Sequence, residues 1–295
     1  MTARPWLVAL SFAPAALGAA PQSQTLLTFR ATTTVVSVPA SVQCGRFPAP
    51  GLTAADFEVL DEGVRQRIES MSTESVPIDV TLAIDTSSSV IADFPAFKLE
   101  VQRFAAMLRP VDRLRVVSFA TGVYEVAPMR AATSDLNLDA LVPGGWTSSN
   151  DGLIYALLWP TDPDRQHLVI ALTDGIDSHS TLGAATLVEI ASRVRAVFHV
   201  VLVAGVGVPA SQWERGARDA VVDVATQSGG AVHELGRASS DFKRIFDDFR
   251  ASYVLRYMPE GVARDGWHDL SVKLLVRDAS RCTIRARRGY WGSAP

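Results

Sequence analysis

The chain has 295 residues, of which 48% are hydrophobic and 20% are charged, a composition typical of a globular protein rather than a disordered or fibrous one. Its 28 Lys and Arg residues nearly balance its 31 Asp and Glu residues, so the net charge gives no reason to expect a nucleic acid as partner. Two cysteines, Cys44 and Cys282, are too few for a disulfide-rich scaffold or a four-cysteine zinc site. They could form one bridge if the chain leaves the cytoplasm.

The first 20 residues have the pattern of a secretory signal peptide. Arg4 and the α-amino group supply positive charge, residues 6–12 are mostly apolar, and residues 15–20 supply small residues for a signal peptidase. We therefore expect cleavage about residues 18–20 and a secreted or periplasmic mature protein; a buried N-terminal strand or helix is the alternative. No later segment has the roughly 18 consecutive apolar residues of a spanning helix, so we expect no transmembrane segment in the mature chain.

Residues 21–75 are predicted to form an N-terminal β segment. Short alternating stretches at 27–29, 34–38, 57–60 and 66–69 are separated by glycines and prolines. This pattern is typical of strands and turns in a small antiparallel sheet.

From residue 76 to residue 252, apolar strands alternate with amphipathic helices. The expected strands are 80–84, 114–119, 168–172 and 198–203, and the expected helices are 94–108, 152–158, 187–197, 215–227 and 241–252. Apolar strands between helices indicate a doubly wound α/β domain, with a mostly parallel sheet covered on both faces. In such sheets, sites form where loops leave the carboxyl ends of the strands.

Residues 253–295 return to strand patterns, at 253–257, 270–274 and 283–287. This C-terminal β segment and the N-terminal one could pair into a single small β module beside the α/β domain. Cys44 and Cys282 lie one in each segment, so a disulfide would join the two halves of that module. Two buried free thiols are the alternative.

Three segments that follow predicted strands or precede a predicted helix carry oxygen side chains. Residues 85–89 read Asp-Thr-Ser-Ser-Ser, Thr147 and Ser148 follow a glycine pair, and Asp174 closes another apolar strand. A Ser-rich turn alone is more often a helix cap than a site. Hydroxyls two residues apart can nevertheless point at one centre, and Mg²⁺ takes about six oxygen ligands. Because all three segments lie where the loops of a parallel sheet gather, together they indicate a cation site.

This combination resembles the metal-ion-dependent adhesion site of the von Willebrand factor type A domain, which joins a D-x-S-x-S segment, a Thr on a second loop and an Asp on a third. The resemblance implies a ligand set of Asp85, Ser87, Ser89, Thr147 and Asp174. The hydroxyls would bind the ion directly, and the two carboxylates would act largely through water and hydrogen bonds. The implied ion is Mg²⁺, with Mn²⁺ or Ca²⁺ as other candidates.

The flanking segments resemble a bacterial, acidobacterial-type family related to the same domain. The matching residues are 51–59, 61–63, 253–257 and 285–290, so the resemblance covers nearly all of the expected mature chain.

The sequence departs from the family pattern at three positions. Ser88 stands where many relatives have glycine, and Trp146 separates the glycine pair from Thr147, which leaves Ser148 as a second candidate ligand. Asp177 could approach the ion or be solvated, and we expect it to be solvated.

The resemblance implies an adhesion-type protein that uses the ion to capture a Glu or Asp carboxylate of a protein partner. The alternatives are a scaffold with a weak or purely structural metal site and, less favoured, a metal-dependent hydrolase. The sequence contains no G-x-S-x-G, H-E-x-x-H or Walker-type motif, so we expect no catalytic residues. Residues 205–210 are expected to be an ordinary glycine-rich turn, and the five histidines show no ligand spacing. A solvated basic face is expected from Arg277, Arg281, Arg285, Arg287 and Arg288.

Overall fold

The computed structural model describes residues 35–292, apart from residues 46, 74–75, 133–135, 161, 163, 204–211, 235–240 and 278. The expected signal peptide, the expected strand 27–29 and the glycine-rich turn 205–210 lie outside the described residues.

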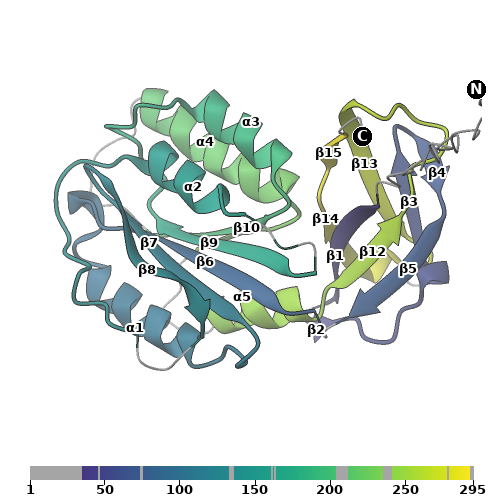
Figure 1. Cartoon of the computed structure of the whole chain (residues 1–295), viewed down its shortest axis with the longest axis horizontal. Helices are drawn as coiled ribbons and strands as arrows, with labels where there is room; N and C mark the ends of the chain where they lie inside the picture. The colour runs from purple at the N-terminus through teal and green to yellow at the C-terminus, as the bar shows by residue number, and fades with distance from the viewer. Residues whose placement is uncertain are drawn as a thin grey trace, which may run out of the picture. The chain divides into compact units, whose positions relative to one another are not determined.

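A six-stranded sheet forms the centre of the α/β domain (Figure 1), and its strand order is β11-β10-β9-β6-β7-β8. The strands are β6 (Ile78–Asp85), β7 (Arg113–Phe119), β8 (Val123–Ala131), β9 (Gln166–Thr173), β10 (Val197–Leu202) and β11 (Val232–Glu234). All neighbours are parallel except β8, which runs antiparallel to β7. The chain order reverses at β6, which lies between β7 and β9, so this is the doubly wound sheet that the sequence predicts.

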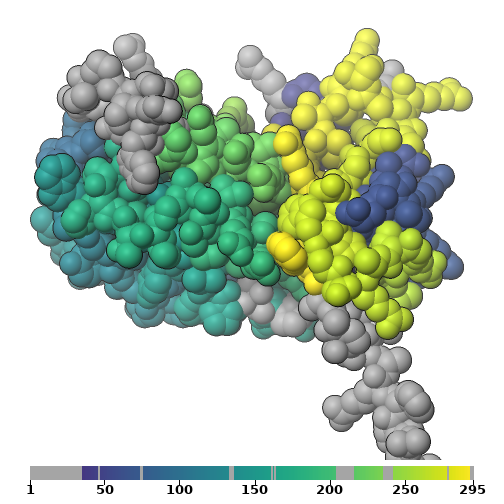
Figure 2. All heavy atoms as spheres, turned by 90° about the horizontal axis from the view of Figure 1, so that it is seen from above, coloured from purple at the N-terminus to yellow at the C-terminus, as the bar shows by residue number. Residues whose placement is uncertain are grey.

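Helices cover both faces of this sheet. One face carries α1 (Phe94–Ala105) and α5 (Asp241–Arg250), and the other carries α2 (Ser149–Leu157), α3 (Ala184–Arg193) and α4 (Gln212–Gln227). Side chains of α3 and α4 form much of the surface in the space-filling view (Figure 2). Every residue of β6 is buried, as expected for a central strand packed on both sides. No helix in the described ranges is long and apolar enough to span a membrane.

The remaining strands form a β module of two antiparallel sheets, with orders β14-β1-β12-β5 and β15-β13-β3-β4, and β2 pairs with β1. The strands are β1 (Val36–Cys44), β2 (Phe47–Pro48), β3 (Phe57–Asp61), β4 (Val64–Gln66), β5 (Ile68–Thr73), β12 (Tyr253–Tyr257), β13 (Gly266–Leu274), β14 (Cys282–Ala286) and β15 (Gly289–Gly292). β1 pairs with β12 and β14, and β3 pairs with β13. The N- and C-terminal segments therefore form one module, as the fold prediction proposed.

A buried hydrogen-bonded cluster joins the two sheets of the module. The Asp61 carboxylate accepts hydrogen bonds from the hydroxyls of Tyr257 and Tyr290, both at 2.8 Å, and lies 2.8 Å from His268 Nδ1. Tyr257 belongs to one sheet, and the other three residues belong to the second. Burial, and then the hydrogen bond to Asp61, raises the pKa of both tyrosines. The resembled segments 61–63 and 285–290 thus contribute Asp61 and Tyr290 to the core of the module.

Four strands were not predicted from the sequence, namely β2, β8, β11 and β15, and the predicted strand 66–69 is divided between β4 and β5. The basic face is also partly wrong, because Arg287 is buried. Its guanidinium donates to the carbonyl oxygens of Ser192 and Val194 at the end of α3 and to that of Gly289. Burial lowers the pKa of Arg287 to about 10. Unpaired carbonyls at a helix C-terminus accept such donors, which explains why this arginine is not solvated.

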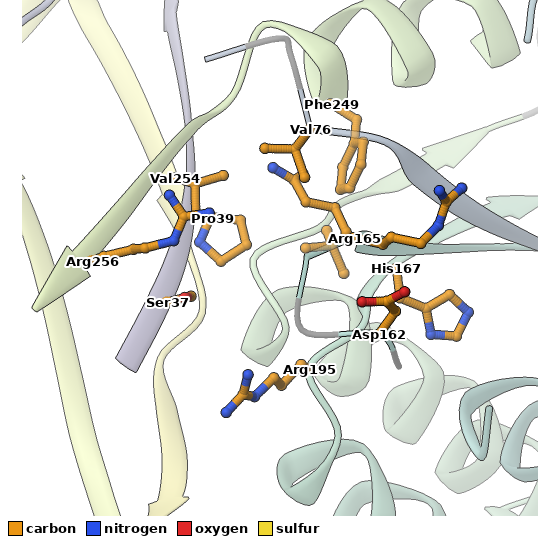
Figure 3. Close-up of a pocket in the computed structure, with 12 residues that line it drawn as sticks. Ser37, Pro39, Val76, Asp162, Arg165, His167, Arg195, Phe249, Val254 and Arg256 are labelled. Atoms are coloured by element: carbon orange, nitrogen blue, oxygen red, sulfur yellow. The ribbon is translucent and has the colours of Figure 1, made fainter. Parts of the chain in front are cut away.

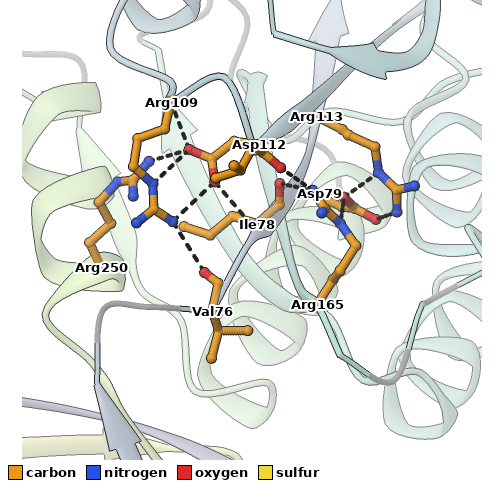
Figure 4. Close-up of polar contacts among 9 residues, drawn as sticks. Val76, Ile78, Asp79, Arg109, Asp112, Arg113, Arg165 and Arg250 are labelled. Atoms are coloured by element: carbon orange, nitrogen blue, oxygen red, sulfur yellow. Dashed lines mark hydrogen bonds and ion pairs between the residues drawn. The ribbon is translucent and has the colours of Figure 1, made fainter.

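Two buried carboxylates anchor the amino ends of β6 and β7 (Figure 4). Asp112 pairs with Arg109 and Arg250 and also accepts the backbone N–H of Ile78 at 3.1 Å. Asp79 pairs with Arg113 and Arg165. Burial alone would raise the pKa of Asp112, but the hydrogen bonds from Arg109 and Ile78 outweigh it and lower that pKa. Each carboxylate is therefore compensated by two arginines.

Replacement of Asp112 by Asn leaves Arg109 and Arg250 without their counter-ion, so we expect the free energy of unfolding at pH 7 to fall by about 3 kcal/mol in a urea titration. Asp247→Asn is the control, because the Asp247 side chain is 51% exposed and its ion pair among the described residues is the one with Lys243, one helical turn away. Its effect should stay below about 0.5 kcal/mol. Because folding lowers the pKa of Asp112, the ionised carboxylate contributes its full stabilisation above pH 3.8, the ordinary pKa of the group. That stabilisation is lost as the pH falls through the pKa that Asp112 has in the folded state. Equal effects of the two variants at pH 7 would contradict the assignment.

Cys44 and Cys282 form a disulfide between paired positions of β1 and β14. The bridge closes a loop across a sequence separation of 238 residues. Replacing both cysteines by Ser should lower the free energy of unfolding by about 2–5 kcal/mol, because the unfolded chain gains conformational freedom. Dithiothreitol should lower the melting temperature of the wild type and leave that of the double variant unchanged. A wild type insensitive to reductant would show that the bridge contributes nothing.

Candidate metal-binding site

The segment after β6 and the glycine pair are joined by backbone hydrogen bonds. The N–H of Gly144 donates to Thr86 O at 2.7 Å, and the N–H of Ser88 donates to Gly145 O at 3.1 Å. Gly145 has φ +88°, and a Cβ at this position would lie 2.4 Å from Thr121 Oγ1. Only glycine fits such a backbone next to that side chain. The second segment is therefore held directly against the first.

The third segment is joined to the second in the same way. The backbone N–H groups of Ser178 and His179 both donate to Thr147 O at 2.9 Å. The N–H of Thr147 in turn donates to Ser178 Oγ at 3.0 Å. The structure thus brings together the three loops that carry the predicted ligands.

Asp85 is buried at the carboxyl end of β6. Its Oδ1 accepts the N–H of Ser87 at 2.9 Å, and its Oδ2 accepts the hydroxyl of Thr173 at 2.7 Å. Burial is the main cause that raises the pKa of Asp85 to about 7, and the charge of Asp174 adds to it. The hydroxyl oxygens of Ser87 and Ser89 lie 3.0 Å apart, so the alternating serines converge as the motif predicts.

Asp174 is the second buried carboxylate, directly after β9. Its Oδ1 accepts the N–H of Ile176 at 2.9 Å, but its Oδ2 is buried with no hydrogen-bond partner among the described residues. Neither Asp85 nor Asp174 forms an ion pair with a basic side chain in the described ranges. Two acidic groups near each other are therefore buried without a positive charge.

The structure favours Thr147 over Ser148 as the hydroxyl of the second loop. The Ser148 hydroxyl donates to Thr121 O at 3.3 Å and is thus engaged elsewhere. No side-chain hydrogen bond of Thr147 occurs within the described part of the chain, although the residue is buried. Its hydroxyl is therefore available to a ligand.

Asp177 has a structural role that the sequence did not reveal. The expectation that it is solvated is wrong, because it is buried and accepts the N–H groups of Asn150 and Ser180 and the hydroxyl of Ser180. Asn150 lies in the first turn of α2, where backbone N–H groups lack partners within the helix. Asp177 thereby fixes the third loop to α2.

The donor set fits a hard divalent cation. Hydroxyl and carboxylate oxygens are the ligands that Mg²⁺ and Ca²⁺ prefer, and a cation would compensate the unpartnered oxygen of Asp174. Within the described ranges, no three His, Cys, Asp or Glu side chains lie together as a metal-binding group. A cation here would therefore depend on Ser87, Ser89 and Thr147 as well as on the two carboxylates.

A second concave feature lies at the opposite, amino-terminal end of the sheet (Figure 3). Residues of β1, β9 and β12 contribute to its lining, among them Ser37, Gln166 and Arg256. Its volume is only about 50 Å³, and one of its lining residues, Arg165, is already paired with Asp79. It has room for a water molecule or two rather than for a larger ligand.

The chain thus contains a doubly wound α/β domain in which hydroxyl and carboxylate side chains gather where the strand order reverses. No family model and no curated protein matches the sequence. Solved structures similar to the chain include von Willebrand factor type A domains, the family that the sequence resembles.

The domain from Catenulispora acidiphila is 14% identical, with 90% of this chain and 76% of that chain covered and a TM-score of 0.45. The ArnB paralog VWA2 from Sulfolobus acidocaldarius is 10% identical, with 88% of this chain and 76% of that chain covered and a TM-score of 0.46. The conserved hypothetical protein BatB from Bacteroides thetaiotaomicron is 17% identical, with 58% of this chain and 96% of that chain covered and a TM-score of 0.44. At such values the likeness concerns the fold alone.

Replacement of Asp174 by Asn should stabilise the protein when metal is removed. Asn can keep the hydrogen bond from Ile176 while it eliminates a buried charge close to Asp85. We expect the free energy of unfolding in EDTA to rise by about 1 kcal/mol, as is common when a functional site loses its electrostatic strain. Chemical denaturation in EDTA measures the change. A loss of stability as large as that expected for Asp112→Asn would show that Asp174 is structural.

Proposed function

We propose that this chain is an extracytoplasmic protein-binding protein that holds a divalent cation, Mg²⁺ in the first place, and uses it to capture a carboxylate of a protein partner. The observation that carries the proposal is the buried Asp174 Oδ2, which has no partner in the described structure and lies near the buried Asp85. An uncompensated pair of buried acids is unfavourable unless a positive charge joins it. No basic side chain supplies that charge in the described ranges, so a cation is the natural complement.

The chain's own groups prepare the site for this role. The N–H of Ser87 and the hydroxyl of Thr173 hold Asp85, and the N–H of Ile176 holds one oxygen of Asp174. These bonds fix the carboxylates while the hydroxyl of Thr147 stays available, and a cation would replace the mutual hydrogen bond of the Ser87 and Ser89 hydroxyls. A divalent cation held largely by neutral hydroxyls keeps a coordination position open to an anionic oxygen, and a Glu or Asp of a partner supplies one.

The disulfide supports the location. Bridges such as Cys44–Cys282 form and persist in oxidising compartments and are rare in the cytosol. This agrees with the signal-peptide pattern of the first 20 residues.

Mg²⁺ should bind and stabilise the wild type, by about 2.7 kcal/mol at one hundred times its dissociation constant. Ser87→Ala and Thr147→Ala should lose most of this stabilisation, because each removes a ligand oxygen. Thr81→Ala is the matched control, since it removes a buried hydroxyl from β6 that bonds to His167 rather than to the site. It should lower stability without changing Mg²⁺ affinity in isothermal titration calorimetry and thermal melts.

A wild type whose melting temperature does not respond to Mg²⁺, Mn²⁺ or Ca²⁺ would contradict the proposal.

Partner capture is tested by retention of a random octapeptide library on the immobilised, Mg²⁺-loaded protein, followed by elution with EDTA. Eluted peptides should be enriched in Asp or Glu, and the Ser87→Ala protein should retain none of them above background.

A further inference from the structure

A groove lies directly beside the candidate metal site. Its volume is about 510 Å³, within the range of ordinary ligand sites. Thr86 and Gly144, which join the first two loops of the site, also line the groove. The other walls are residues 120–122, the start of β8 and residues 140 and 142. A ligand at the metal site can therefore extend into this groove.

Large apolar side chains are unusually exposed around this position. Tyr124 and Val142 line the groove and are 66% and 72% exposed, and Trp146, which precedes Thr147, is 65% exposed. The ring of Tyr124 lies against the backbone of Gly122, where an added Cβ would be 2.9 Å from the Tyr124 hydroxyl. Clustered apolar side chains beside a polar centre are typical of protein-binding surfaces.

The edge of the sheet indicates the shape of the partner. β8 is the last strand of the six-stranded sheet, so in the described structure its outer edge has no neighbouring strand. The second half of β8 is protected by Pro128 and by irregular register against β7. Residues 123–126 contain no proline, and three of them line the groove. An extended segment is the partner that satisfies such an open edge.

On the basis of the proposed function, we infer that the partner binds as an extended segment paired with residues 123–126. Its acidic residue reaches the metal site, and a neighbouring apolar side chain packs against Tyr124 and Val142. Glu125, also in the groove, does not repel the acid, because it is paired with Arg115 at 2.7 Å. Four residues of a strand span about 13 Å, so the acid and the apolar residue should lie within about four positions of each other.

The octapeptide library on the immobilised, Mg²⁺-loaded full chain tests this arrangement. The retained peptides should share an apolar or aromatic residue within about four positions of their acid. For the tightest peptide, Tyr124→Ala and Val142→Ser should each weaken binding about tenfold while Mg²⁺ affinity is unchanged. Val111→Ser is the control, because Val111 is 55% exposed at the opposite end of the sheet. It should change neither peptide binding nor Mg²⁺ affinity.

A second measurement tests strand pairing. Methylation of single backbone nitrogens in that peptide should weaken binding at alternate positions, because only every second N–H of a strand faces its neighbour. Equal tolerance at all positions would overturn the pairing. Acidic peptides could instead be retained in a Mg²⁺-dependent way without an apolar residue, and equally by Tyr124→Ala and Val142→Ser. That result would overturn the inference about the groove but not the proposed metal site. Absence of both Mg²⁺ binding and Mg²⁺-dependent retention would overturn the proposed function itself.

Discussion

The reversal of strand order at β6 is the constraint on which the candidate site depends. Because β6 lies between β7 and β9, the parallel register pairs Ile84 with Leu172, and the next residues along the two strands are Asp85 and Thr173. The hydrogen bond between these two side chains follows from that register. One residue further, Asp174 enters the same space. Two acids 89 positions apart in the sequence thus meet because two strand ends are adjacent.

The two ends of the same strand treat buried charge in opposite ways. At the amino end, Asp79 is held by two arginines, and Asp112 beside it is held by two more. At the carboxyl end, Asp85 and Asp174 are equally buried, and in the described structure no arginine or lysine pairs with them. Burial alone therefore does not distinguish the two pairs. The difference is compensation, and the uncompensated pair at the carboxyl end is where the proposed cation would bind.

Much of the fold could be predicted from the sequence, because β6 and β9 are buried on both faces and carry apolar runs at residues 82–84 and 168–172. The parallel sheet predicted that the three loops with oxygen side chains lie close together. The resemblance to the von Willebrand factor type A domain added which of their residues would bind the ion. β8 was missed because an edge strand with Pro128 shows weak alternation. The links from Asp177 to α2 and from Arg287 to α3 were missed because Asn150, Ser192 and Val194 lie 27 residues or more away in the sequence. Sequence periodicity shows which face of an element a residue occupies, but not what covers that face.

The interleaved β module also sets an order of events during folding. In the described structure β1 pairs with the two-residue strand β2, and its two long partners are β12 and β14. These long partners exist only after the residues that follow the α/β domain have been made. The α/β domain has its own sheet and cores and can form earlier. Pairing between distant segments is slow, because a long loop must close before any contact is gained. The β module therefore completes last, and a chain that stopped before residue 253 would carry unpaired strands open to aggregation.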